Sequence, residues 1–565
     1  MYALIAGVTV AIIVATLIVC KHFVYPVFLS PLASLPAAHP LAHITSLWIQ
    51  WQRFRGSEFQ CIAAAFASKG PYVRLGPREL AVNDIDAVGS AWGAGSANFD
   101  KHPSYLFFMT HGTPNTFTTL LSSEHRRRRR RVRIVYSRAF LLTSPHMRAI
   151  LVGIILDRLR PLLARIAGSP LGATDVMPLA QSYVLDFVSA FGFGLPLGLD
   201  FLSDSAAHKR WLDLYNLSFP GGTTGFWLKE HPWLTRLLCS LGVPMIPDGY
   251  AKSRRELENW AIEKVDAAEK LLQWHREKNS MAAGELPVLY DAVRSGMAQA
   301  DGFSGIGNFT PSPAQRLELA SECLDHIGEW SLNRSERPEL PVSERKSAIR
   351  LTRGHHRAAS TGETFGTTFT YMIYELSRHM DVQRELRKEL HSIDNPFRDT
   401  SNHTGLPASE ALERLPFLDA IIKESLRLRN TSPNLDPRVS PAHCTSHLGR
   451  ISCLPPGIRV GTYGWWLNRN PHVYPDPDSW RPNRWLRGGS EDAAVLNRWL
   501  FAFSSGSRGC VGQPIAMELL RMGLAAIYTS YTTSIADERE YPGANQSMSA
   551  YCTDKLFICF KYLST

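Results

Sequence analysis

A cysteine set among glycines near the end of the chain is the strongest candidate for chemistry. Phe503 to Gly512 reads F-S-S-G-S-R-G-C-V-G. Glycines beside Cys510 let backbone N–H groups approach its sulfur and moderate the charge of a thiolate, and a helix starting directly after it would add its positive end. We predict a thiolate that binds haem iron, a ligand that favours O–O cleavage, with Arg508 reaching an anionic propionate. The alternative is a buried structural cysteine in a glycine-rich turn.

The motif F-x-x-G-x-R-x-C-x-G carries a family resemblance. Through these ten residues the sequence resembles the cytochrome P450 family, and the resemblance covers nearly everything after about residue 45. Segments such as Y-V-R-L-G-P-R-E-L-A-V-N look like filamentous-fungal members. The resemblance implies haem b as the cofactor, Cys510 as the iron ligand, and Phe503, Arg508 and Gly512 as parts of the haem-binding loop.

A glutamate and two arginines match a second pattern of the family. K-E-S-L-R-L-R places Glu424 and Arg427 at i and i+3, on one face of a helix. Arg484 follows in W-R-P-N-R-W, where members often have Glu in place of Asn483. Alone, the first pair reads as a surface ion pair worth well under ~1 kcal/mol. The resemblance implies instead that Glu424, Arg427 and Arg484 form a buried triad behind the haem.

Further basic residues match the places at which the family binds haem propionates. Arg438 in L-D-P-R-V-S-P is one, with a strand-edge arginine as the alternative. His125 and Arg129 fit H-x-x-x-R and would share a helix face. The run Arg126–Arg131 leaves the register open. It could also be a basic localisation patch, a solvated face or a docking surface for an acidic reductase.

The segment A-A-S-T-G-E-T-F-G resembles the oxygen-activating element of the family. Glu363 and Thr364 match its acid–alcohol pair, which delivers protons to iron-bound dioxygen. Ser360 and Thr361 replace the usual small pair, which puts the expected kink of this helix in question. The alternative is an ordinary capping threonine beside a helical glutamate.

The elements that must position these residues are mostly helices. Amphipathic patterns run from about Glu124 to Val265 and from Thr364 to Leu390, and a last helix follows Cys510. Pro71 to Asn83 reads as a β-hairpin, and the chain after Asn430 is Pro-rich and irregular. We therefore expect a mainly α fold with minor β: the cytochrome P450 fold, with a helical domain around haem and a smaller β-rich part near the N-terminus.

The N-terminal residues have a different character. Tyr2 to Cys20 carries no charge and is about long enough to span a bilayer, and Lys21 follows it. We expect a transmembrane anchor at 2–20, a connector at 21–45 whose prolines end the helix, and a haem domain at 46–565. A cleaved signal peptide is the alternative, but no basic residue precedes the apolar run.

Composition restricts the partners and the compartment. The 565 residues are 45% hydrophobic and 20% charged, which suits one large globular unit. The net charge of +10 comes without a nucleic-acid motif, so we expect anionic lipid or an acidic protein as partners, and no nucleic acid. Nine widely spaced cysteines without a C-x-x-C pair indicate a reducing compartment.

The resemblance implies a monooxygenase of the endoplasmic reticulum with its catalytic domain in the cytosol. Its substrate would be a lipophilic small molecule of secondary metabolism, contacted near Gly112–Phe117 and Phe219–Trp227. Electrons would come from NADPH through cytochrome P450 reductase, with cytochrome b5 as a further donor. Two alternatives remain: a haem-thiolate isomerase or dehydratase that needs no reductase, and a catalytically defective haem protein.

The last alternative arises from an interruption at residues 329–357. Upstream, Leu317, Ala320, Leu324 and Ile327 have helical spacing, as if they formed the first half of the helix that carries Glu363. The segment between carries two prolines and many charges, and a helix interior does not tolerate such prolines at about 3 kcal/mol each. It is either a translated intron or a genuine loop extruded from the helix.

Sequencing the transcript distinguishes the two. Gly328-Glu329-Trp330 can be encoded by a common splice-donor pattern, so the intron hypothesis predicts that mature message lacks the codons for 329–357. Spliced message that retains these codons would establish the loop.

Overall fold

The computed structural model describes most of the chain. The described residues are 2–93, 99–170, 172–303, 309–327, 361–394, 397, 405–429, 435–442, 446–486, 492–536 and 556–563, without the side chains of 2–4 and 361–363. The expected insertion at 329–357 therefore lies outside the described residues.

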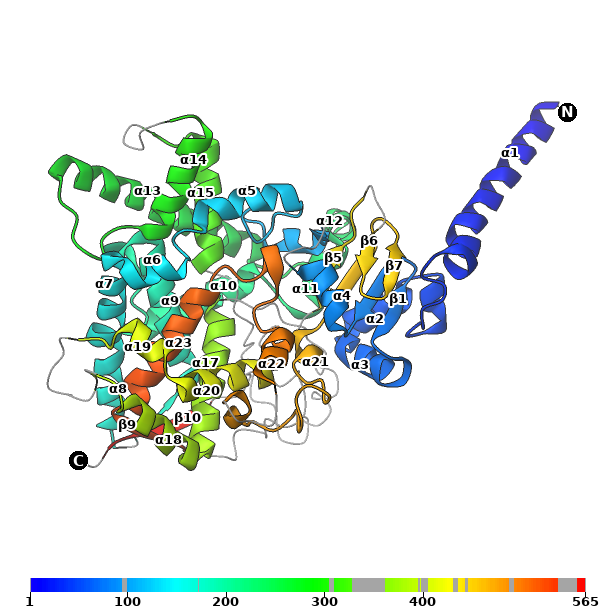
Figure 1. Cartoon of the computed structure of the whole chain (residues 1–565). Helices are drawn as coiled ribbons and strands as arrows, with labels where there is room; N and C mark the ends of the chain where they lie inside the picture. The colour runs from blue at the N-terminus through cyan, green and yellow to red at the C-terminus, as the bar shows by residue number, and fades with distance from the viewer. Residues whose placement is uncertain are drawn as a thin grey trace, which may run out of the picture.

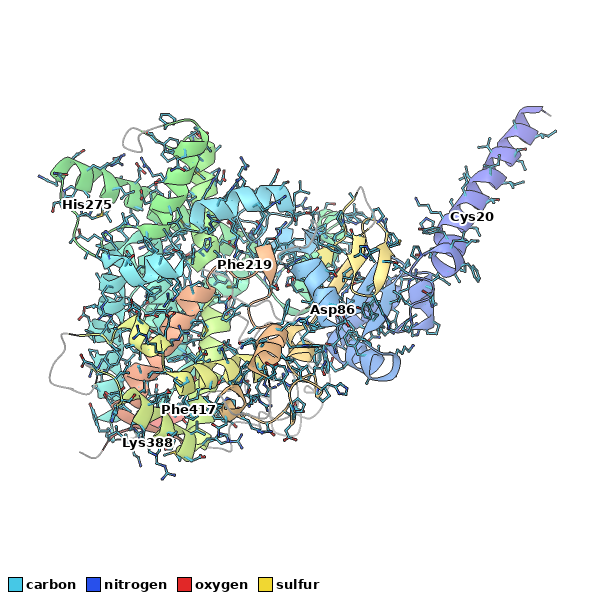
Figure 2. The ribbon with its side chains drawn as sticks, viewed as in Figure 1. Cys20, Asp86, Phe219, His275, Lys388 and Phe417 are labelled. Atoms are coloured by element: carbon cyan, nitrogen blue, oxygen red, sulfur yellow. The ribbon has the colours of Figure 1, made fainter. Side chains whose placement is uncertain are left out.

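An apolar helix projects from the body at the N-terminus (Figure 1). It consists of α1 (Tyr2–Val19) and the π-helical η1 (Cys20–Leu29), and Figure 2 places Cys20 on it. Residues Ile5–Leu29 are long and apolar enough to cross a membrane, and no residue of their most apolar 18-residue stretch is buried by the rest of the chain. Among the described residues, only Val176–Phe193 also passes this test, but it is mostly buried as a core helix.

The expectation that prolines end this helix after residue 20 was wrong. Pro26 lies inside η1, and the helix ends where Ser30 donates its N–H to the carbonyl of Tyr25. Proline lacks the N–H of a regular helix and clashes with the carbonyl four residues earlier. The wider π-helical register leaves room for the ring, so the apolar helix is about ten residues longer than we expected.

The body is mainly α-helical, as predicted. Its α-helices are α2 (Leu47–Arg55), α3 (Glu58–Lys69), α4 (Ile85–Trp92), α5 (Ser122–Val132), α6 (Arg138–Thr143), α7 (Pro145–Ile154), α8 (Arg160–Ala167), α9 (Val176–Phe193), α10 (Ser205–Ser218), α11 (Gly222–Glu230), α12 (Pro232–Ser240), α13 (Tyr250–Lys278), α14 (Val288–Ala300), α15 (Pro313–Ile327), α17 (Thr361–Arg378), α18 (Met380–Leu390), α19 (Ser409–Glu413), α20 (Pro416–Leu428), α21 (Gly464–Leu467), α22 (Ala493–Trp499) and α23 (Gln513–Tyr528). Shorter turns are η2 (Pro40–His43), η3 (Pro103–Phe108), η4 (Ile155–Leu159), η5 (Leu195–Leu197), η8 (Pro482–Trp485) and η9 (Gly506–Arg508).

In the described ranges the strands form three small sheets. They are β1 (Tyr72–Gly76), β2 (Glu79–Val82), β3 (Asp100–Lys101), β4 (Ala173–Asp175), β5 (Asp436–Val439), β6 (Ser446–Leu448), β7 (Ile451–Leu454), β8 (Arg459–Thr462), β9 (Tyr531–Ile535) and β10 (Phe557–Tyr562). The sheet orders are β1-β2-β8-β5-β3, β4-β10-β9 and β6-β7.

The largest sheet joins distant parts of the sequence. The predicted hairpin is confirmed, with β1 antiparallel to β2 and Tyr72 opposite Val82. The segment after Asn430, expected to be irregular, instead contributes β5 and β8, and β8 runs parallel to β2. At the other edge β3 pairs with β5, which places Lys101 opposite Arg438.

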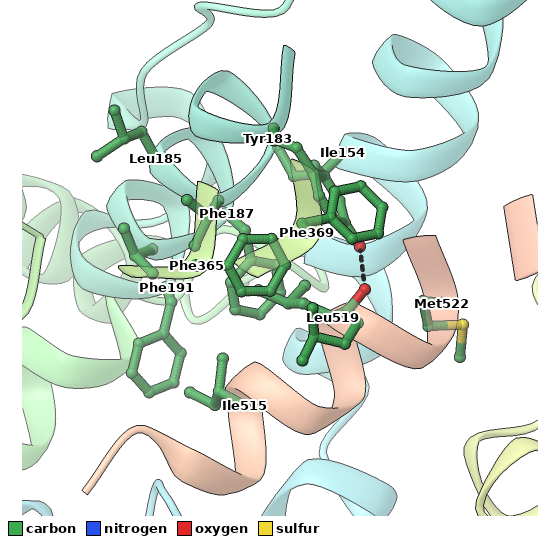
Figure 3. Close-up of a cluster of buried hydrophobic side chains, with 14 of the residues drawn as sticks. Ile154, Tyr183, Leu185, Phe187, Phe191, Phe365, Phe369, Ile515, Leu519 and Met522 are labelled. Atoms are coloured by element: carbon green, nitrogen blue, oxygen red, sulfur yellow. Dashed lines mark hydrogen bonds between the residues drawn. The ribbon is translucent and has the colours of Figure 1, made fainter. Parts of the chain in front are cut away.

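The main core lies where α9, α17 and α23 pack together (Figure 3). Phe365 and Phe369 of α17 and Leu519 of α23 are buried, and the Tyr183 hydroxyl of α9 donates to the Leu519 carbonyl at 3.1 Å. The predicted Thr364–Leu390 helix is divided at His379 into α17 and α18. This core fixes the helices from which the cavity is built.

Candidate active site

One cavity of about 490 Å³ lies among helices and loops from all parts of the body. Its lining includes eight of the residues that the sequence predicted for the site: His125, Arg129, Thr364, Arg438, Phe503, Arg508, Cys510 and Gly512. They come from α5, α17, β5 and the loop before α23, so the fold brings together residues that lie nearly 390 positions apart.

Cys510 lies in a tight loop whose ends are hydrogen-bonded. The Cys510 N–H donates to the carbonyl of Phe503 at 2.9 Å, and the Gly509 N–H donates to that of Gly506 at 3.1 Å. Helix α23 begins at Gln513, three residues after Cys510 rather than directly after it. The cysteine therefore faces the cavity just before the positive end of a long, buried helix.

The glycine on which this loop depends is Gly506. Its φ of +66° lies in the left-handed region, and a Cβ there would lie 2.0 Å from the carbonyl oxygen of Trp92 at the end of α4. A Cβ at Gly512, by contrast, would make an ordinary 3.8 Å contact with the Cys510 sulfur. Gly506 allows the loop to pack directly against α4.

The arginine run of α5 divides into three groups. His125 and Arg129 line the cavity, and the Arg129 guanidinium donates to the Gly509 carbonyl at 2.5 Å. Arg128 and Arg131 form ion pairs with Glu318 of α15, at 2.5 and 2.6 Å. Arg126, Arg127, Arg130 and Arg133 are exposed. The helical period thus selects His125 and Arg129 from the ambiguous run.

Arg438 and Arg508 approach the cavity from two other elements. Arg438 is buried and paired with Asp436, whose carboxylate also accepts from the Tyr105 hydroxyl at 2.7 Å. Arg508 donates to the carbonyls of Thr119 and Leu120. These contacts occupy the terminal nitrogens of Arg508 and hold both guanidinium groups at the cavity wall.

Each of three cavity residues has one buried nitrogen without a partner. Within the described part of the chain, His125 Nδ1, Arg438 Nε and Arg508 Nε make no hydrogen bond. Burial and the positive charges of Arg508, Lys101, Arg129 and Arg438 lower the pKa of His125 to about 2, and burial with Arg438 lowers the pKa of Arg508 to about 10. Crowded arginines and a neutral histidine with unpartnered nitrogens, beside a cysteine, suit the two propionates of a haem.

The predicted triad residues meet behind this wall. The Arg427 guanidinium forms two hydrogen bonds of 2.8 Å with Glu424, and Arg484 Nε lies 3.1 Å from the same carboxylate. All three side chains are fully buried. Trp485 also donates its indole N–H to Glu424, at 2.9 Å. The cluster is a closed network of charges, and it does not reach the cavity lining.

The oxygen-activating pair is described only in part. Thr364 lines the cavity from the first turns of α17, as does Thr368 one turn later. Glu363 belongs to the same helix, but its side chain is outside the described part of the structure. The alcohol of the predicted pair therefore has access to the cavity, and the role of the acid stays a prediction.

A polar cluster on α15 was not predicted from the sequence. Asp325 and His326 line the cavity, and Glu322 lies 3.3 Å from His326 Nε2. Burial raises the pKa of Asp325 to about 7, against the effect of His326. The polar residues of E-C-L-D-H-I stand at i, i+3 and i+4, a spacing that predicts a cluster on one helix face. We read this segment only for its apolar positions.

Charged residues of a second part of the lining were also not predicted. Arg53, Glu58, Lys229, Glu230 and Arg459 face the cavity, from α2, α3, α11 and β8. Phe117 and Phe226, from the two segments expected to contact substrate, line it as well, but Phe226 lies on helix α11 rather than in a loop. Nothing in the local sequence marks Arg53 or Arg459, because only the folded sheet brings them together.

Comparisons with known proteins agree with this geometry. The family model for cytochrome P450 matches residues 357–560. The chain is 26% identical to cytochrome P450 monooxygenase avaI of Aspergillus versicolor, over 81% of this chain and 94% of that protein. It is 24% identical to fusicoccadiene C-8 hydroxylase of Alternaria brassicicola, over 90% and 86%. It is 25% identical to tryptophan 6-hydroxylase fscE of Fusarium equiseti, over 90% and 87%.

Removal of the shared carboxylate tests the triad. Glu424→Gln leaves two buried guanidinium groups without their counter-charge, so we expect a loss of about 3–5 kcal/mol in stability. The measurements are the thermal unfolding midpoint and the haem content of the purified protein. The control is Asp86→Asn, whose carboxylate is 71% exposed and pairs with Arg498 at the surface (Figure 2). Equal midpoints for the two variants would contradict the prediction.

Proposed function

Because this chain belongs to the cytochrome P450 family, we propose that it is a monooxygenase of lipophilic small molecules. It would insert one atom of dioxygen into its substrate and reduce the other to water, with electrons from NADPH supplied through a reductase. The observation that carries the proposal is that Cys510 faces the same cavity as the unpartnered nitrogens of His125, Arg438 and Arg508. The relatives named as monooxygenases and hydroxylases support it.

We propose haem b as the cofactor of this cavity. Haem bound through a thiolate supplies the chemistry that activates dioxygen. Cys510 Sγ would bind the iron. His125 Nδ1, Arg438 Nε and Arg508 Nε would donate to the propionates, and Arg129 would add its charge. The buried Glu424–Arg427–Arg484 network would hold the polypeptide behind the haem in a fixed conformation.

The remaining lining would orient the substrate and exclude water. Val184, Val188, Phe191 and Phe365 present apolar surface from α9 and α17. Such a wall binds a lipophilic molecule by burial of its surface and leaves few polar groups to fix its orientation. The hydroxyl of Thr364 would hold a proton, directly or through one water molecule, at the position where dioxygen is reduced.

The surface and the N-terminal helix suggest where the enzyme works. Ile5–Leu29 would anchor it in the membrane of the endoplasmic reticulum, with the body in the cytosol because Lys21, in the half of this helix nearer the body, favours that side. The exposed arginines of α5 would attract an acidic surface of the reductase or of cytochrome b5.

The absorbance of the reduced protein under carbon monoxide tests Cys510 directly. We expect the wild-type Soret band at the position that indicates thiolate ligation, since the sulfur pushes electron density onto the iron. Cys510→Ser should lose that band or lose haem altogether. Cys453→Ser, at an exposed cysteine of β7, should keep it. A wild-type band typical of a neutral ligand would refute the assignment.

Turnover tests the threonine. Delivery of protons by a positioned side chain contributes about 10²–10⁴-fold, so Thr364→Ala should lower product formed per NADPH consumed on the order of 10²-fold while the carbon monoxide spectrum is retained. Thr368→Ala, at another threonine of the same cavity, is the matched control and should stay coupled. Product formation without NADPH would instead favour the isomerase.

A further inference from the structure

A lysine faces the substrate cavity from α11. Gly222, Gly225, Phe226 and Lys229 stand at positions i, i+3, i+4 and i+7 and all line the cavity, so they form one face of this helix. Two of these residues are glycines, which add no side-chain volume. A Cβ on Gly225 would lie 2.5 Å from the carbonyl oxygen of Pro220, so this glycine lets α11 pack closely, and Lys229 is the long, charged side chain of this face.

The surroundings of the Lys229 ammonium group are aromatic. Its nitrogen lies 4.9 Å from the ring centroid of Phe107 and 5.2 Å from that of Phe108, both in η3. Among the residues that the structure describes, it forms no ion pair and no hydrogen bond. Contact with two ring faces stabilises a cation, but it satisfies none of the three N–H donors.

The nearby carboxylates are already bound to arginines. Glu230 accepts from two nitrogens of Arg459, at 2.8 and 3.2 Å, and lies 3.9 Å from Arg53. Glu58 accepts from Arg53 Nε at 2.8 Å, and Glu79 pairs with the same arginine from behind the wall. These carboxylates are therefore held away from Lys229.

Burial makes the charged form of this lysine less favourable. Burial lowers the pKa of Lys229 to about 8, although the Glu230 carboxylate raises it. At neutral pH the group is still mainly an ammonium ion. A cation in such a place gains most from an anionic acceptor, and an ionised acceptor forms a stronger hydrogen bond than a neutral one.

We propose that Lys229 binds a carboxylate of the substrate, so that the enzyme acts on apolar carboxylic acids. This inference rests on the proposed function, because it takes the cavity as the place where substrate is oxidised. The apolar walls would hold the hydrocarbon part, and the salt bridge would fix which carbon is presented for oxidation. In the described residues Lys229 forms no hydrogen bond with the terminal carbonyls of α11, so it does not cap its own helix.

Matched pairs of ligands test this inference. The probes are dehydroabietic acid with its methyl ester and hexadecanoic acid with its methyl ester, added to the full-length haem-loaded protein in detergent. Affinity is measured from quenching of tryptophan fluorescence and from ligand-induced change in the Soret band. A charged hydrogen bond is worth about 10-fold to 10²-fold in affinity, so at least one acid should bind that much more tightly than its ester.

Variants assign the preference to the lysine. Lys229→Met replaces the lysine with an unbranched side chain one atom shorter and without charge, so it should bind acid and ester equally while its ester affinity is unchanged. Lys252→Met removes an exposed lysine of α13 and should keep the preference for the acid. A retained carbon monoxide spectrum shows that each variant is folded.

Three outcomes would overturn the inference. They are equal binding of acid and ester by the wild type, a preference that persists in Lys229→Met, and failure of both acids to bind. Each of them can occur in a protein with the thiolate spectrum and NADPH-dependent turnover, so failure of this inference is distinguishable from failure of the proposed function.

Discussion

Positive charge in the interior is the constraint on which this structure depends. His125, Arg129, Arg438 and Arg508 converge on one cavity wall, and within the described residues Arg438 is balanced by Asp436. Removing cations from water is costly unless anions accompany them. The lowered pKa values of His125 and Arg508 express that cost. A dianionic haem would relieve it, so binding of the cofactor and stability of this wall would be coupled.

The same constraint has a different solution behind the cavity. Glu424 meets Arg427 and Arg484 with all three side chains fully buried, and carbonyls of the loop near Pro477 accept the remaining N–H groups. This network needs no ligand, and its geometry is closed. The protein therefore has two kinds of buried charge cluster. Closed networks fix the conformation of the polypeptide, whereas incomplete ones, at His125, Arg438, Arg508 and Lys229, have donors left over for a ligand.

Local patterns and the family resemblance predicted most of the helical content and eight of the residues that line the cavity. F-S-S-G-S-R-G-C-V-G is contiguous, and H-x-x-x-R needs only one turn of α5. Features that depend on distant partners were missed. Pairing of β8 with β2 brings Arg459 to Glu79, which lies 380 residues earlier in the chain. No local sequence property of either segment predicts this pairing. Pro26 was misjudged because the rule for α-helices does not hold for the wider π-helical turn.

The positions of α15 and α17 bear on the interruption between them. Both helices pack against α9, they contact each other, and both line the cavity through His326 and Thr364. If 329–357 were absent from the protein, only four residues would separate Ile327 from Thr361, about one helical turn. The interruption therefore falls between two helices that both contribute to the wall of the proposed site.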